Sequence, residues 1–355
     1  KGQGQNPLEW LENNPLAYKK YKVFSTLFAD FNIYKNLTFK TQFGFDFSHS
    51  TGFSQSFASY PPNLGEGMAS RSSSDGLNLQ WTNTLNYRFN VDDIHDFNFL
   101  LGHEWQDYHA ERFSVRSEGQ TNDKLTDIST GTRVTSWDSM STSDYARMSF
   151  FGRAEYNFAD RYYVEGSLRT DGSSRFGSKG RWASFWSLGF MWNMRSESFL
   201  KDYTWLTNAQ IAVSTGTSGN SSIPNYDHLA LVAGGKEYWG QAAIGPYSKG
   251  NENLEWEKLW TSNIALHLGF WGRLNVDAEL YNKLTTNMLM SVPDSYANGG
   301  FGSVWDNVGA MLNRGVELNV SADVLRYKDF NWNINANVSY NHNEIKALYN
   351  GLDEY

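Results

Sequence analysis

The sequence predicts an all-β protein, an antiparallel transmembrane β-barrel to which this chain contributes about twelve strands. Three observations support this: alternating apolar and polar residues recur along the chain, short and long connections alternate, and aromatic residues are abundant. Successive side chains of a strand point to opposite faces, so each alternating segment has one apolar and one polar face. Outer-membrane barrels turn the apolar face to lipid and the polar face to a watery lumen.

The last strand-like segment shows the pattern most clearly. From Phe330 to Tyr340 every even position is apolar or aromatic, and asparagine or serine fills the positions between. Such a segment can span a bilayer when tilted, since a transmembrane strand needs about 9–11 residues. The other predicted strands, in order, are Val23–Phe31, Leu37–Phe47, Leu77–Phe89, His95–Asp107, Tyr145–Phe158, Tyr162–Thr170, Trp182–Asn193, Thr204–Thr215, Leu259–Phe270, Leu274–Leu284 and Arg314–Leu325.

The connections between these strands alternate in length. The short ones are Asn32–Asn36, Asn90–Ile94, Ala159–Arg161, Met194–Tyr203, Trp271–Arg273 and Arg326–Asp329. The long ones are Ser48–Gly76, Tyr108–Asp144, Asp171–Arg181, Gly216–Lys258 and Thr285–Asn313. Short periplasmic turns and long extracellular loops are typical of outer-membrane barrels. A soluble β-sandwich has no reason to separate its loops in this way.

Composition narrows the class further. Aromatic residues make up 16% of the 355 residues, which suits aromatic girdles at two membrane interfaces. Mean hydropathy is −0.56, and no apolar run approaches the roughly 20 residues of a membrane helix, which excludes a helical membrane protein. The chain has no cysteine, so disulfides and thiolate metal sites are excluded. The net charge of −8 without a basic stripe argues against nucleic acid as a partner.

No catalytic constellation is visible, and we predict neither an enzyme nor a cofactor or metal. The seven histidines are scattered, and His103-Glu104 lacks the second histidine of a zinc motif. Ser173 and Ser174 have no histidine near them in sequence. We interpret the surrounding DGSSRFG segment as a shaped loop, in which glycines allow unusual φ angles and an arginine pairs with an aspartate.

Four segments carry recognisable motifs. They read LRTDGSSRFG at 168–177, followed by Arg181-Trp182, then NENLEWEK at 251–258, NVGAMLNRGVEL at 307–318 and FNWNINANVSYNHNEIKAL at 330–348. Together they resemble the SusC/RagA group of TonB-dependent outer-membrane transporters of Bacteroidetes-type bacteria, although Glu252 stands where that group usually has proline. The motif residues to which we assign a structural role are Asp171, Gly172, Arg175, Gly177, Trp182, Trp256, Gly309 and Gly315.

The resemblance implies a plugged barrel of about 22 strands in the outer membrane of a Gram-negative bacterium. It also implies energy supplied through TonB, a SusD-like surface lipoprotein that closes the mouth over glycan or peptide oligomers, and a homodimer of transporter–lid pairs. We recognise no N-terminal domain, plug or TonB box in residues 1–355. We therefore expect them to be an internal portion of a longer transporter that also lacks the final strands.

Aromatic side chains in the predicted long loops are candidates for contact with substrate or lid. They are Tyr60, Trp137, Tyr238, Trp239, Tyr296 and Trp305, with Lys236, Glu237 and Asp306 as polar companions. Aromatic faces stack on sugars and peptide side chains, but they also pack on one another, on a lid or at the lipid interface. The sequence leaves open a passive porin, an adhesin barrel and a soluble all-β glycan-binding protein or glycosidase.

Overall fold

The computed structural model describes residues 6–349, except for the side chains of residues 136–140 and 298. The chain forms two compact units. Unit 1 comprises Lys1–Ala29, Gln42–Trp81 and Trp105–Ala146, and unit 2 comprises Asp30–Thr41, Thr82–Glu104 and Arg147–Tyr355.

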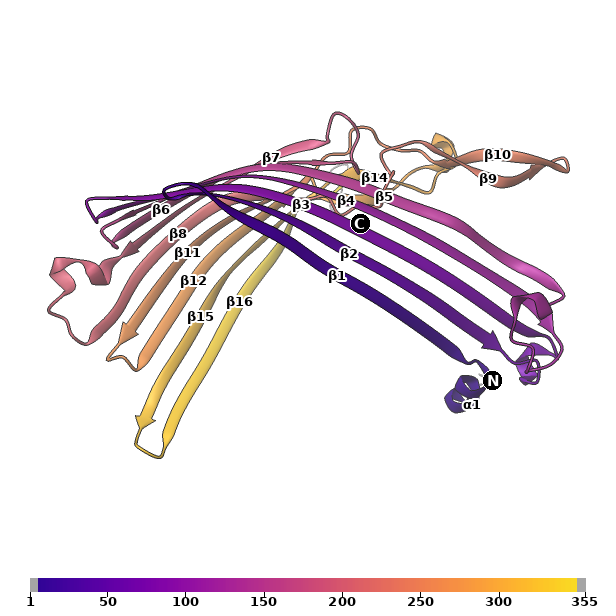
Figure 1. Cartoon of the computed structure of the whole chain (residues 1–355), viewed down its shortest axis with the longest axis horizontal. Helices are drawn as coiled ribbons and strands as arrows, with labels where there is room; N and C mark the ends of the chain where they lie inside the picture. The colour runs from indigo at the N-terminus through magenta and orange to yellow at the C-terminus, as the bar shows by residue number, and fades with distance from the viewer. Residues whose placement is uncertain (1–5, 350–355) are drawn as a thin grey trace. The chain divides into compact units, whose positions relative to one another are not determined.

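Twelve strands form one sheet in the order β1-β2-β3-β4-β5-β6-β7-β8-β11-β12-β15-β16 (Figure 1). Every pairing from β5 to β16 is antiparallel. The bounds are β1 Leu16–Tyr34, β2 Leu37–Ser56, β3 Gly67–Val91, β4 His95–Gln120, β5 Arg133–Phe158, β6 Tyr162–Ser173, β7 Trp182–Asn193, β8 Leu206–Asn220, β11 Glu257–Phe270, β12 Leu274–Thr286, β15 Ala310–Arg326 and β16 Asn331–Ala347. The predicted all-β class with about twelve antiparallel strands is confirmed.

The short connections are tight hairpin turns. Asp92 and Asp93 have φ angles of 54° and 55°, and Ala159 and Asp160 have φ angles of 52° and 54°. Two adjacent residues with positive φ are typical of type I′ turns, whose twist matches that of the flanking strands. These turns bring consecutive strands directly together, as the short spacing predicts.

The connection between β7 and β8 is longer than the other short turns and is held by hydrogen bonds to one buried glutamate. Glu197 is 8% exposed, and its carboxylate accepts hydrogen bonds from Tyr162 Oη at 2.6 Å, Trp192 Nε1 at 3.2 Å and Arg161 at 3.4 Å. The Tyr162 phenol, followed by the Trp192 indole, holds the pKa of Glu197 below its usual value. The hydrogen bonds of Glu197 thus hold the connection between β7 and β8 against the start of β6.

Two predicted loops are largely strand, which corrects the sequence analysis. The segments Ser48–Gly76 and Tyr108–Asp144 shrink to connections at 57–66 and 121–132, because β2 to β5 run on beyond the predicted ends. In the extended region a Cβ on Gly52 would collide with Ser72 Oγ, so β2 and β3 still lie side by side there. The apolar alternation ends where lipid contact ends, whereas backbone pairing needs no apolar face.

Smaller elements occupy the remaining connections and were not predicted. Two hairpins lie in the long loops: β9 Leu231–Tyr238 with β10 Gln241–Ser248, and β13 Leu289–Pro293 with β14 Ser303–Asn307. The helices are α1 Pro7–Asn13 and the single turns η1 Pro61–Asn63, η2 Ile128–Thr130, η3 Met194–Ser196, η4 Ser198–Leu200 and η5 Tyr296–Asn298. None of the helices within residues 6–349 has the length and apolar character to cross a membrane.

The two faces of the sheet in unit 2 differ as the alternation predicts. Leu168, Leu188 and Val213 on the apolar face are 59%, 57% and 41% exposed, as expected for side chains that meet lipid. The buried apolar cluster of unit 2 lies instead on the polar face, where long loops return to the sheet. The buried core of unit 2 therefore lies between the polar face of the sheet and the loops that return to it.

Candidate functional site

The polar face of unit 2 carries a buried aromatic cluster at its long-loop end. This loop core consists of Phe176, Phe185, Ile223, Leu254 and Trp256. The Trp256 side chain is 2% exposed, its ring centroid lies 5.4 Å from that of Phe176 and 5.8 Å from that of Phe185, and its Nε1 donates to the Arg181 carbonyl at 3.1 Å. Trp256 therefore packs on the segment from Phe176 to Phe185, and the loop core as a whole unites that segment with Ile223 and with Leu254 and Trp256.

Glycines allow the loop backbones to approach one another in the loop core. A Cβ on Gly177 would lie 2.7 Å from the Glu252 carbonyl oxygen, and one on Gly180 would collide with the Leu254 carbonyl. The expectation that Gly172 and Gly177 adopt unusual φ angles is wrong, because neither has a positive φ. These positions require glycine because a larger residue would have no room for its side chain.

Asparagines join a third loop to this core. Asn307 Oδ1 accepts from the Glu255 amide at 2.8 Å, and its Nδ2 donates to the Glu255 and Asn287 carbonyls at 2.8 and 3.0 Å. Asn251 Nδ2 donates to the Trp305 carbonyl at 3.0 Å. Because both asparagines bond to backbone, they fix loop geometry.

Within the DGSSRFG segment the pairing differs from the expected one. Arg175 does not pair with Asp171; its Nε donates to Asn225 Oδ1 at 2.8 Å and its guanidinium reaches the Ser221 carbonyl at 3.2 Å. Asp171 pairs with Arg169, whose Nε lies 2.7 Å from Asp171 Oδ1. Arg175 therefore holds the loop after β8, and the buried carboxylate is neutralised from its own strand.

Arg169 is the centre of a polar network that the sequence analysis missed. Its guanidinium also donates to Ser149 Oγ at 2.9 Å and to Glu104 Oε1 at 3.2 Å, and it lies over the Phe151 ring at 5.2 Å. The spacing of Arg169 and Asp171 could have predicted their ion pair from the sequence, since residues two apart in a strand share a face.

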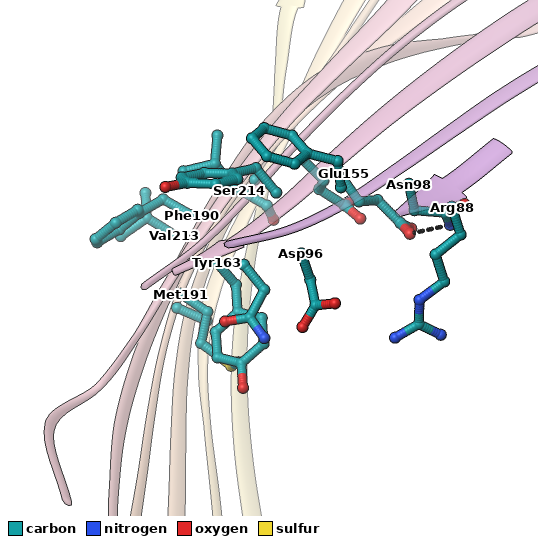
Figure 2. A pocket seen from close by; sticks show the side chains of 16 residues that line it. Arg88, Asp96, Asn98, Glu155, Tyr163, Phe190, Met191, Val213 and Ser214 are labelled. Atoms are coloured by element: carbon teal, nitrogen blue, oxygen red, sulfur yellow. Dashed lines mark hydrogen bonds between the residues drawn. The ribbon is translucent and has the colours of Figure 1, made fainter. Parts of the chain in front are cut away.

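A hollow of about 490 Å³ lies near the short-turn end of unit 2 (Figure 2). Its charged lining includes Arg88, Asp96, Glu155 and Glu165. Asn98 Nδ2 donates to Glu155 Oε2 at 2.6 Å, the bond drawn in Figure 2. Apolar residues, among them Phe190, Met191 and Val213, complete the lining.

The candidate aromatic residues fall into two groups. Tyr238, Trp239 and Tyr296 are 72%, 90% and 76% exposed, the first two at the tip of the β9–β10 hairpin. Tyr60, in unit 1, is only 5% exposed, and Trp305 packs against the loop core. Trp137 belongs to β5, but its side chain lies outside the described ones.

Their polar companions are divided in the same way. Lys236 and Glu237 lie on β9 beside the exposed tip. Asp306 Oδ1 instead accepts from Asn251 Nδ2 at 3.1 Å, beside the loop core.

The remaining motif residues lie at close approaches. A Cβ on Gly172 would meet the Trp182 ring at 2.9 Å, and one on Gly315 would collide with the Tyr340 carbonyl. Gly309 has a φ angle of 81°, a conformation that favours glycine. Among the described residues no group of three or more His, Cys, Asp or Glu side chains is placed to hold a metal ion.

Comparison with known proteins decides the family. The family model described as "TonB dependent receptor-like, beta-barrel" matches residues 2–354. The TonB-dependent receptor SusC of Bacteroides thetaiotaomicron is 32% identical over 77% of this chain and 28% of its own length. The chain belongs to the SusC/RagA family of TonB-dependent receptors. TonB-dependent receptor P39 of Formosa agariphila is 28% identical over 96% of this chain and 34% of its own length.

Solved structures of this family agree. The chain in "Structure of the RagAB peptide importer in the 'closed-closed' state" matches with a TM-score of 0.91 and 33% identity, over 97% of this chain and 38% of that one. The SusC/RagA family is a family of outer-membrane β-barrels, so the apolar face of the sheet is the lipid-facing one and the long loops are extracellular. The chain spans about a third of the length of the relatives it matches.

Proposed function

We propose that this chain forms part of the barrel wall of a TonB-dependent outer-membrane importer. The importer takes up oligomeric nutrients, glycan or peptide, and works with a SusD-like surface lipoprotein. The observation that carries the proposal is the match to the receptor β-barrel model along residues 2–354. The relative named SusC and the neighbour titled as the RagAB peptide importer support a transport function.

The polar face suits passage of an oligomer. Carboxylates, amides and guanidinium groups line it from the Arg169 network to the hollow of Figure 2. Such groups exchange hydrogen bonds with hydroxyl or peptide groups at little net cost, because water already competes for them. In this proposal a plug outside this chain closes the lumen between transport events.

The aromatic side chains of the extracellular loops have two different roles in this proposal. Tyr238, Trp239 and Tyr296 contact substrate or lid in this proposal, since their rings are exposed. Tyr60 is buried and Trp305 is half-buried against the loop core, so they are assigned to loop structure. The motif residues around Trp256 fix the loops from which the exposed rings project.

The test is uptake by cells that carry the full-length gene, its deletion, or the gene in a strain without TonB. The cells receive fluorescent oligosaccharides or oligopeptides too large for porins. The proposal expects uptake of one class that is lost in both the deletion and the TonB-deficient strain, and co-purification of a lipoprotein. Uptake that survives TonB loss would identify a passive porin, and binding without uptake an adhesin.

A further inference from the structure

The lipid-facing side of β11, β12, β15 and β16 contains one polar row. In register, Ser262, Asn282, Arg314 and His342 lie side by side across the strands. The next row toward the short turns is apolar and consists of Ile264, Leu280, Val316 and Tyr340. On the other side lie Trp260, Leu284 and Leu312, with Glu344 at the β16 end of that row. Because residues two apart on a strand share a face, all three rows face the membrane side.

The polar row lies near the outer edge of the apolar band. From Leu274 at the short turn to Asn282, the strand rises about 26 Å at about 3.3 Å per residue. With a tilt of about 40°, that corresponds to roughly 20 Å of depth in an apolar band about 25 Å tall. Trp260 donates its Nε1 to Thr215 at 2.9 Å and lies 6.3 Å from Trp186. Such a tryptophan pair is typical of a membrane interface.

The polar and apolar rows line a shared groove of about 710 Å³. Arg314 is exposed in it. Glu344, in the adjacent row, forms an ion pair with Lys346 at 2.7 Å and also interacts electrostatically with Arg314. One carboxylate therefore stands against two cations, and no ion pair within 4 Å to Arg314 is found among the described side chains. The groove and its border therefore combine an excess of positive charge at Arg314 and Lys346, hydrogen-bonding side chains and an apolar floor.

We propose that this groove binds the phosphorylated headgroup of an outer-leaflet glycolipid. The guanidinium of Arg314 holds a phosphate in the two-bond geometry that arginine favours. Ser262, Asn282 and His342 bond to neighbouring oxygens, and the acyl chains lie along the apolar row. A cation that faces lipid is costly deep in the band and is stabilised by an anion at its edge.

Charge and position together favour this occupant over a neutral lipid or a soluble anion. A neutral lipid would supply no anion for the positive charge of Arg314 and Lys346 that exceeds the charge of Glu344. A soluble anion would leave the apolar floor uncovered. The inference rests on the outer-membrane location of the family and does not depend on which substrate is carried. Arg314 faces away from the lumen, so its replacement tests the groove without altering the transport path.

The experiment uses the full-length transporter purified in detergent and titrated with bisphosphorylated lipid A, with bound lipid counted by native mass spectrometry. Arg314→Gln should weaken binding about fivefold. Arg314→Lys keeps the charge but not the two-bond geometry, so its affinity should lie between those of Arg314→Gln and wild type. The matched control is Lys283→Gln, which removes a cation one residue from Asn282 but on the polar face, and should stay within about twofold of wild type. Uptake by Arg314→Gln should be unchanged.

Three outcomes would overturn the proposal. They are equal binding by Arg314→Gln and wild type, equal binding of lipid A whose phosphates have been removed, and displacement of the lipid by inorganic phosphate alone. Reduced self-association of Arg314→Gln with unchanged lipid binding would point instead to a second protein molecule in the groove. If Arg314→Gln fails to assemble, Asn282→Leu tests the same groove and should also weaken binding.

Discussion

Trp256→Ala should open the loop core without unfolding the barrel wall. The Trp256 side chain is 2% exposed and bonds to the Arg181 carbonyl. Truncating a buried tryptophan costs about 3–5 kcal/mol, and the abandoned carbonyl adds about 1 kcal/mol. Since every 1.4 kcal/mol is about tenfold, the equilibrium constant for loop opening should rise by roughly a thousandfold or more. The strand ladder makes no use of this side chain.

Limited trypsinolysis of the folded transporter in detergent measures this opening. Lys179 lies in the loop after β6, next to the core, whereas Lys236 lies on the exposed β9–β10 hairpin. Cleavage after Lys179 should accelerate by roughly a thousandfold, or up to the rate of an unfolded loop, because cleavage follows the open population. Cleavage after Lys236 should not change and serves as an internal reference.

Trp239→Ala is the matched control in the same long loop. Its side chain is 90% exposed, so the substitution should change stability by less than about 0.5 kcal/mol. The reasoning fails if Trp256→Ala leaves cleavage after Lys179 within a few-fold of wild type. It also fails if Trp239→Ala accelerates that cleavage equally, since burial would then not be the cause.

Three further predictions concern other parts of unit 2. Gly177→Ala should accelerate cleavage of the same loop, because its Cβ would lie 2.7 Å from a carbonyl oxygen, whereas Gly234→Ala, with nothing within 4 Å, should not. Arg169→Met should lower the free energy of unfolding by about 1.5–3 kcal/mol. Adding Asp171→Asn should recover part of that loss. If it recovers none, the lost ion pair is not the cause. Glu197→Gln should lower the melting temperature at pH 7. Because the pKa of this carboxyl is lowered in the folded state, its contribution is present above the ordinary carboxyl pKa and is lost as pH falls through the lowered value. The difference from wild type should therefore shrink below about pH 4, and a pH-independent difference would refute the assignment.

The sequence predicts the lipid-facing strands well because lipid imposes a strict rule on them. Trp182–Asn193 was predicted with the bounds that β7 has. The short turns follow equally well, since two residues of positive φ leave little freedom in register. Outside the membrane, strands do not need alternating apolar residues. The sequence therefore predicts a loop at the serine-rich ends of β2 and β3, although the structure has strand there.

The loop core could not be predicted from alternation. Phe185 lies on the polar face of β7, where alternation predicts contact with water, yet it is 6% exposed. The residue that covers it, Trp256, lies in a different loop far along the chain. The family motifs identify the segments involved, but motif order does not state which backbones touch. The partner of Arg175 was wrongly predicted for the same reason.

The division between buried and exposed loop aromatics has a functional consequence. On a barrel wall, backbone pairing holds the strands, so the loop core fixes only the loops that pack around Trp256. Tyr238 and Trp239 take no part in that core and sit at a hairpin tip. Substitutions at the tip should therefore alter contact with substrate or lid while loop protection stays intact, and substitutions in the core should alter both. A tip variant that lost uptake and loop protection together would show that the tip packs on the core, and the two roles could not then be separated.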